Sequence, residues 1–147
     1  ALKISSDLER MGDLATNISK RIFLLNENLP ENLIDALVRV SSNVQKQLKS
    51  ILDAYLDRSS AMAVNVWEGD EHIDDLTNLC MQEVIKYLKE NEKNLDDGTH
   101  LLFVTKNIER IGDHTTNIAE QIYYLVTGEY LEGDRPKGTE PVVTGEK

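Results

Sequence analysis

The stretch DLERMGDLATNI, residues 7–18, is written a second time one hundred positions later as NIERIGDHTTNI, residues 107–118. The two copies share a glutamate, an arginine, a glycine, an aspartate, a threonine, an asparagine and an isoleucine in the same register, and the match extends to Ile22 and Ile122. Helix faces that only meet solvent do not repeat such a set of residues in register. The copies therefore indicate corresponding helices of two tandem repeats.

Apolar residues recur every three or four positions along most of the chain, which predicts helices. A first helix is expected to run from the start to about Leu25, where NENLPEN interrupts the pattern. Further helices are expected over residues 31–66, 70–92 and 99–127, separated by WEGD and NEKNLDDG. No strand pattern of useful length is present in the sequence, so the predicted class is all-α.

These helices divide into two repeats. Residues 29–128 are expected to form a complete antiparallel three-helix bundle that ends in the second copy of the motif. Residues 1–28 are expected to be the last helix of a preceding, truncated repeat, because the chain opens in mid-helix without a capping residue. Residues 129–147 are rich in glycine, proline and charge without a sustained period, which predicts a flexible tail.

Composition restricts the possible partners. The 147 residues carry a formal net charge of −10, and such an acidic surface repels the nucleic-acid backbone, so no nucleic-acid partner is expected. Cations and basic protein surfaces remain compatible with this charge. No apolar run approaches the roughly 20 residues of a membrane span, so no direct membrane insertion is expected. The single Cys80 lies in an apolar helical stretch and is expected to be a buried thiol.

The second copy of the motif carries a stripe of oxygen-bearing side chains. Glu109, Asp113 and Asn117 are spaced four residues apart, and each step advances only about 40° around a helix. The apolar residues of the same helix fall on roughly the opposite side. We therefore expect these carboxylates to face out of the local bundle.

A second acidic pair precedes them in the chain. Asp70 and Asp74 are also four residues apart, and a neighbouring antiparallel helix could offer them to the same surface groove as Glu109 and Asp113. Like charges crowded in this way repel one another unless a cation or a basic group neutralises them. Oxygen ligands favour Mg, Mn or Ca, and iron is also compatible. Gly112, between the acids, would allow a close approach of helices.

Simpler interpretations of the same residues remain open. Acid pairs at this spacing are common on solvated helix faces, and Asp70 could serve only as the N-cap of its helix. A ferritin-like di-iron site is disfavoured because the sequence contains no Glu-x-x-His pair. Thr16 and Thr116 are expected to hydrogen-bond to the preceding helical turn. The repetition of the whole motif favours a site over a solvated face.

The stretches HLLFVTKNIERIGDHTTNIAEQI, residues 100–122, and ALKISSDLERMGDLATNISKRI, residues 1–22, resemble the PhoU family of phosphate-specific transport systems. The resemblance implies an all-α fold and a metal cluster of Mg, Mn, Fe or Zn on the bundle surface. It assigns Asp70, Asp74, Glu109 and Asp113 to the second repeat, and Glu9 and Asp13 to the first. It further implies a cytoplasmic negative regulator, peripherally associated with the membrane, that connects the phosphate ABC transporter ATPase to a sensor histidine kinase.

Two other functions are compatible with the same sequence. The acids could serve a metal-dependent hydrolase or phosphatase, although no nucleophile or activating base is evident, so no enzymatic activity is expected. The chain could also be a structural helical interaction module. Phosphate is not expected as a direct ligand, since the acidic face of the motif would repel it. The first helix carries apolar residues that could dock on the bundle or on a second copy of the chain, which makes a homo-oligomer an open alternative: Leu8, Met11, Ile18 and Ile22.

Overall fold

The computed structural model describes residues 2–26 and 28–131. Within them every regular element is a helix, which confirms the predicted all-α class. The elements are α1 (Leu2–Ile22), α2 (Glu31–Asp57), α3 (Ser60–Glu68), α4 (Asp70–Glu90), the short 3₁₀ helix η1 (Glu92–Asn94) and α5 (Leu95–Thr127). Most of the predicted tail, residues 132–147, lies outside the described residues.

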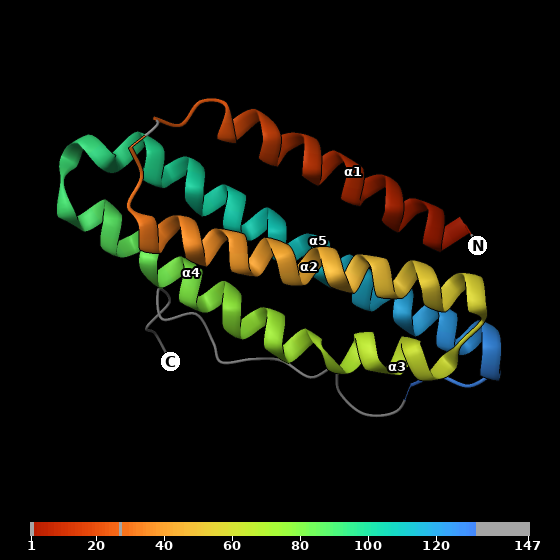
Figure 1. Cartoon of the computed structure of the whole chain (residues 1–147). Helices are drawn as coiled ribbons and strands as arrows, with labels where there is room; N and C mark the ends of the chain where they lie inside the picture. Colours follow the sequence, from red (N-terminus) through yellow and green to blue (C-terminus); the bar gives the residue numbers. More distant parts are fainter. Residues whose placement is uncertain (1, 27, 132–147) are drawn as a thin grey trace, which may run out of the picture.

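The helices form an elongated antiparallel bundle, shown in Figure 1. The chain runs along α2, returns through α3 and α4, which follow one another, and runs forward again along α5. All four of these helices lie against one another, whereas α1 lies directly against α5 alone. The two helices that carry the repeated motif, α1 and α5, are therefore neighbours and run in opposite directions.

The long helix predicted over residues 31–66 is interrupted, so that prediction was wrong. Arg58 adopts left-handed backbone angles (φ 49°, ψ 47°), and the backbone N–H of Ser59 donates to the carbonyl of Ala54 at 3.0 Å. The hydroxyl of Ser59 then accepts a hydrogen bond from the backbone N–H of Met62 at 3.1 Å and caps α3. The three- and four-residue spacing of apolar residues continues across this turn, so the spacing did not indicate the break. In the sequence, the break is indicated only by a serine that can cap a helix.

The core lies between α5 and the helices that surround it. Its middle part is built from α2, α4 and α5, with Val40, Cys80 and Val104 all buried. A second part joins α2, α3 and α5, and it also includes Ile4 and Met11 of α1. The first helix is thus docked on the bundle by its own apolar residues, as one of the sequence-based alternatives proposed.

Other apolar side chains of α1 and of the turn after it stay at the surface. Ile22 is 51% exposed and Phe23 is 89% exposed. Across the described residues, none of the helices combines the length and the apolar character that a membrane-spanning helix requires.

Candidate metal centre

Three aspartates from two helices meet where α4 begins. Asp70 and Asp74 lie one turn apart in α4, and Asp113 reaches them from α5. One carboxylate oxygen from each lies within 4.8 Å of the other two. These three residues, called the acid cluster below, were all predicted from the sequence as ligands.

The prediction of a shared surface groove was wrong for the two aspartates of α4, which are buried. Asp70 is only 2% exposed and Asp74 only 8% exposed. The reason lies at Gly112, where a Cβ would stand 3.2 Å from Cγ2 of Ile73. Since Gly112 has no side chain, Ile73 and the start of α4 come close to α5, and this close approach covers the acids.

Thr116 supports the acid cluster in a way that the sequence did not reveal. Its hydroxyl lies 3.1 Å from the carbonyl oxygen of Gly112, the bond to the preceding turn that was expected. It also lies 3.3 Å from Oδ1 of Asp70, to which it can donate instead. The only signal in the sequence was that threonine occurs at the same place in both copies. A hydrogen bond to the preceding helical turn could by itself explain that recurrence.

Glu109 does not join the three aspartates. Its Oε1 lies 3.1 Å from Nζ of Lys106, one turn earlier on the same helix. The groups of metal-ligating side chains found among the described residues do not include it. The structure therefore places Glu109 beside the acid cluster, in a half-exposed ion pair.

The acids of the first copy lie elsewhere. Glu9 and Asp13 are both exposed on α1. Within the described residues they belong to no group of converging ligand atoms. The structure thus brings together three of the six acids that the sequence analysis named.

The donor set of the acid cluster fits a hard cation. Its ligand atoms are all carboxylate oxygens, which suit Mg, Mn, Ca or iron. They suit Zn less well, because Zn prefers nitrogen and sulfur ligands. Cys80, the one cysteine of the chain, also lies on α4 but does not belong to the cluster. Its sulfur lies 3.5 Å from the hydroxyl of Thr105, and burial raises the pKa of its thiol. The carboxylates of the acid cluster, two of them buried and one half-buried, repel one another, and a bound cation would offset that repulsion.

Comparisons with known proteins agree with this architecture. The PhoU domain family matches residues 37–122. Over 138 residues the chain is 46% identical to a phosphate-specific transport system accessory protein PhoU homolog of Caulobacter vibrioides, covering 93% of this chain and 60% of the relative. The corresponding homolog of Rhizobium meliloti is 44% identical over 138 residues, covering 93% of this chain and 58% of the relative.

A solved structure shows the same fold. The crystal structure of the phosphate transport system regulatory protein PhoU from Streptococcus pneumoniae superposes with a TM-score of 0.75 at 32% identity, covering 88% of this chain and 61% of that one. The chain therefore spans about three fifths of the length of these relatives. With a family match over more than half of its length and this fold, the chain belongs to the PhoU domain family.

Proposed function

We propose that the chain is a metal-binding regulatory adaptor of phosphate uptake and not an enzyme. The observation that carries the metal part of the proposal is the acid cluster, three largely buried carboxylates that converge from two helices. We assign the cation, divalent or iron, to Asp70, Asp74 and Asp113. Glu109 would act beside them, and Glu9 and Asp13 would contribute less, since the described residues place no other acid with them.

The bound cation would offset the repulsion between the carboxylates of the acid cluster. Because two of them belong to α4 and one to α5, neutralising all three would hold the start of α4 against the middle of α5. Thr116, which lies 3.3 Å from Asp70, would orient one carboxylate of the set. Metal binding to the folded chain alone would then stabilise it against unfolding.

The regulatory part of the proposal rests on the relatives, which are named as accessory or regulatory proteins of phosphate transport. We propose that the chain contacts the ATPase of a phosphate ABC transporter on the cytoplasmic side of the membrane and restrains a sensor histidine kinase. We also propose that residues 1–28 and 29–128 belong to two tandem repeats. The repeated motif on the neighbouring helices α1 and α5 supports this division.

Metal content measured by elemental analysis tests the site. We expect Asp74→Asn and Asp113→Asn to lose most of the bound metal, because each removes one charged ligand from the cluster. Asp13→Asn changes the matching position of the exposed first copy, and Asp35→Asn changes an exposed acid of α2. Both controls should keep the metal. Equal metal content in Asp113→Asn and Asp13→Asn would overturn the assignment.

Binding and activity assays test the adaptor role. The chain, loaded with metal, should bind the purified transporter ATPase and the cytoplasmic part of the kinase, and Asp74→Asn should bind less. A phosphatase assay on the same samples distinguishes the adaptor from the alternative function, a metal-dependent phosphatase. Hydrolysis that disappears in Asp74→Asn would favour an enzyme and count against an adaptor.

A further inference from the structure

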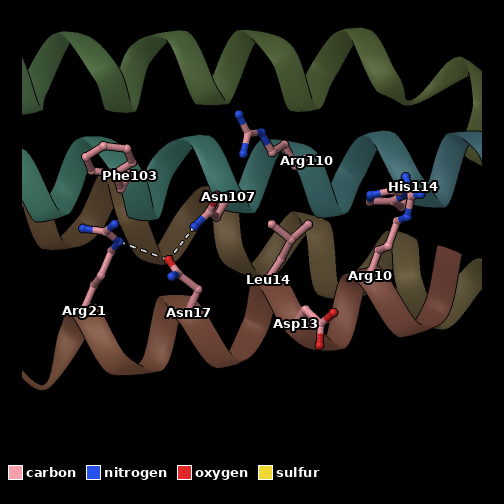
Figure 2. Close-up of a pocket in the computed structure, with 9 residues that line it drawn as sticks. All are labelled: Arg10, Asp13, Leu14, Asn17, Arg21, Phe103, Asn107, Arg110 and His114. Atoms are coloured by element: carbon pink, nitrogen blue, oxygen red, sulfur yellow. Dashed lines mark hydrogen bonds between the residues drawn. The ribbon is translucent and has the colours of Figure 1, made fainter. Parts of the chain in front are cut away.

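A groove of about 490 Å³ lies between α1 and α5, away from the acid cluster. Its lining includes the cations Arg10, Arg21 and Arg110, together with Asp13, Phe103 and His114, as Figure 2 shows. We call it the arginine groove. The lining contains three arginines and one carboxylate, although the whole chain has a net charge of −10. Cations therefore outnumber carboxylates in the lining of this groove, the reverse of the balance in the whole chain.

Two of these arginines occupy the same position in the two motif copies. Arg10 follows Glu9 on α1, and Arg110 follows Glu109 on α5. Both side chains are exposed, and neither forms an ion pair with any residue that the structure describes. The antiparallel packing of α1 on α5 therefore places both arginines in the lining of one groove.

The third arginine and the walls of the groove are held in place. The guanidinium of Arg21 lies 4.1 Å from the centre of the Phe103 ring, and its Nε donates to Oδ1 of Asn17 at 3.0 Å. The same oxygen accepts a hydrogen bond from Nδ2 of Asn107 on α5 at 2.8 Å, drawn as a dashed line in Figure 2. These contacts tie α1 to α5 at one end of the groove.

A second tie lies at the other end. Nδ1 of His114 is 2.7 Å from Oδ1 of Asp7, whose other oxygen accepts from Nε2 of Gln121 at 2.8 Å. The groove is thus bounded by cross-helix hydrogen bonds at both ends. A ligand would meet a site whose walls are already ordered, which reduces the loss of conformational entropy on binding.

The positive charges are spread along the groove. Arg10 and Arg21 are eleven residues apart on one helix, a separation of about 16 Å along the axis. On α5, Phe103 is level with Arg21 and His114 is level with Asp7, so Arg110 lies between them. A single orthophosphate could not reach all three cations. The planar guanidinium groups match phosphate oxygens in paired hydrogen bonds.

We propose that the arginine groove binds a small anion that carries two or more phosphate groups in a row. The expectation from the sequence that phosphate is not a direct ligand considered only the acidic face of the motif. On α5 the groove is lined by Arg110 and not by Glu109 or Asp113, while on α1 Asp13 is the one acid of the motif in its lining. The proposal does not depend on a metal in the acid cluster, because no residue of that cluster lines the groove.

Isothermal titration of the full chain, in buffer without added metal, tests the proposal. We expect binding of inorganic tripolyphosphate and pyrophosphate, and at least about tenfold weaker binding of orthophosphate, since a single phosphate reaches fewer arginines. ADP distinguishes the source of the phosphates. If ADP binds more tightly than pyrophosphate, the ligand is a nucleotide whose base adds contacts. If the two bind equally, the ligand is an inorganic phosphate chain. Tripolyphosphate also chelates metals. Binding heat that persists in Asp74→Asn would come from the groove and not from metal removal.

Matched arginine variants locate the site. Arg10→Ala and Arg110→Ala should each lower the affinity for tripolyphosphate about tenfold, the loss expected for charge-assisted hydrogen bonds. Arg10→Lys keeps the charge but loses the paired geometry, so it should also bind more weakly than the unchanged chain. Arg39→Ala removes an exposed arginine of α2, outside the groove, and should change the affinity less than twofold, by about 0.4 kcal/mol at most.

Three results would overturn the proposal. The first is equal weakening in Arg10→Ala and Arg39→Ala, which would show only a diffuse attraction between opposite charges. The second is affinity for orthophosphate equal to that for tripolyphosphate. The third is tighter binding of a hexaglutamate peptide than of tripolyphosphate, which would identify an acidic protein segment as the ligand. Thermal unfolding of each variant verifies that the exposed arginine changes leave the fold intact.

Discussion

The two copies of the motif carry the same residues on neighbouring helices, yet their surroundings are opposite. A Cβ added at Gly12 would meet no atom within 4 Å, whereas one added at Gly112 would stand 3.2 Å from the side chain of Ile73. Ile22 is 51% exposed, and its counterpart Ile122 is 1% exposed. The first copy lies on a helix supported on one side, and the second on a helix that is surrounded.

The same contrast holds for the polar residues. Thr16 donates only to the carbonyl of Gly12, at 3.0 Å, while Thr116 also reaches Asp70. Asp13 is exposed, and Asp113 converges with two buried aspartates of α4. The motif therefore places the side chains on a helix, but the helix packed against it decides whether they form a site. Substitutions made in pairs, one in each copy, separate these two contributions.

The largest expected difference is in the core. Ile122→Ala should lower the free energy of unfolding by about 3 kcal/mol, because it leaves a cavity among buried side chains. Ile22→Ala, at the matching exposed position, should change it by less than about 0.5 kcal/mol. Urea unfolding measures both. Similar losses in the two variants would show that Ile22 is buried in solution, for example against a second copy of the chain.

The glycine pair should differ in sign. Gly112→Leu should lower the free energy of unfolding by about 2 kcal/mol, because the new side chain would force Ile73 and α4 away from α5. Gly12→Leu should raise it by about 0.7 kcal/mol, since leucine is a better helix former and the space is open. Thermal unfolding at matched protein concentration detects both changes. A stabilised Gly112→Leu would contradict the close approach of α4.

The threonine pair should show a smaller effect. Thr116→Val removes the hydroxyl beside Asp70 and should cost about 1 kcal/mol of stability in the metal-free chain. Thr16→Val removes only an exposed bond to the preceding turn, and its effect should stay below about 0.5 kcal/mol. Denaturant titration in the presence of a chelator compares them. If both losses are equal, the hydroxyl of Thr116 serves only the turn.

The smallest expected effect is on how stability depends on pH, and it involves Cys80 of α4, the helix that covers the second copy. Burial raises the pKa of Cys80 in α4, so the folded chain holds this proton more tightly than the unfolded chain does. Its contribution to stability is complete below the usual thiol range and is lost as the pH rises through it. Between pH 7 and pH 9.5 the unchanged chain should therefore lose more stability than Cys80→Ala.

Other groups titrate equally in both proteins, so the difference between the two pH slopes isolates the thiol. Urea unfolding at the two pH values measures it. Identical slopes would mean that Cys80 is accessible to water in solution, and hence that α4 covers the second copy less tightly than the structure shows.

Much of this structure could be predicted from the sequence. The helical class followed from apolar residues at three- and four-residue steps, and the repeat of the motif identified the two helices that now lie side by side. The spacing of Asp70 and Asp74 placed them on one face of a helix, and Gly112 indicated a close helix approach. Apart from the repeat, each of these features depends on residues near one another in the chain.

Other features could not be predicted in this way. The burial of the acid cluster depends on how closely α4 approaches α5, and the period of a single helix does not report that distance. The break at Arg58 left the apolar pattern unchanged. His114 pairs with Asp7, more than a hundred residues away in the chain.

By itself, the sequence determined that the chain is helical, that acids recur four residues apart in two of the expected helices, and that one motif occurs twice, because these properties can be read from residue spacing. Only the tertiary structure decided that one copy becomes part of a buried acid cluster while the other stays exposed. It also decided that the arginines of both copies share one groove. Burial and the sum of charges at a point depend on which helices pack together, and residues distant in the chain set that packing.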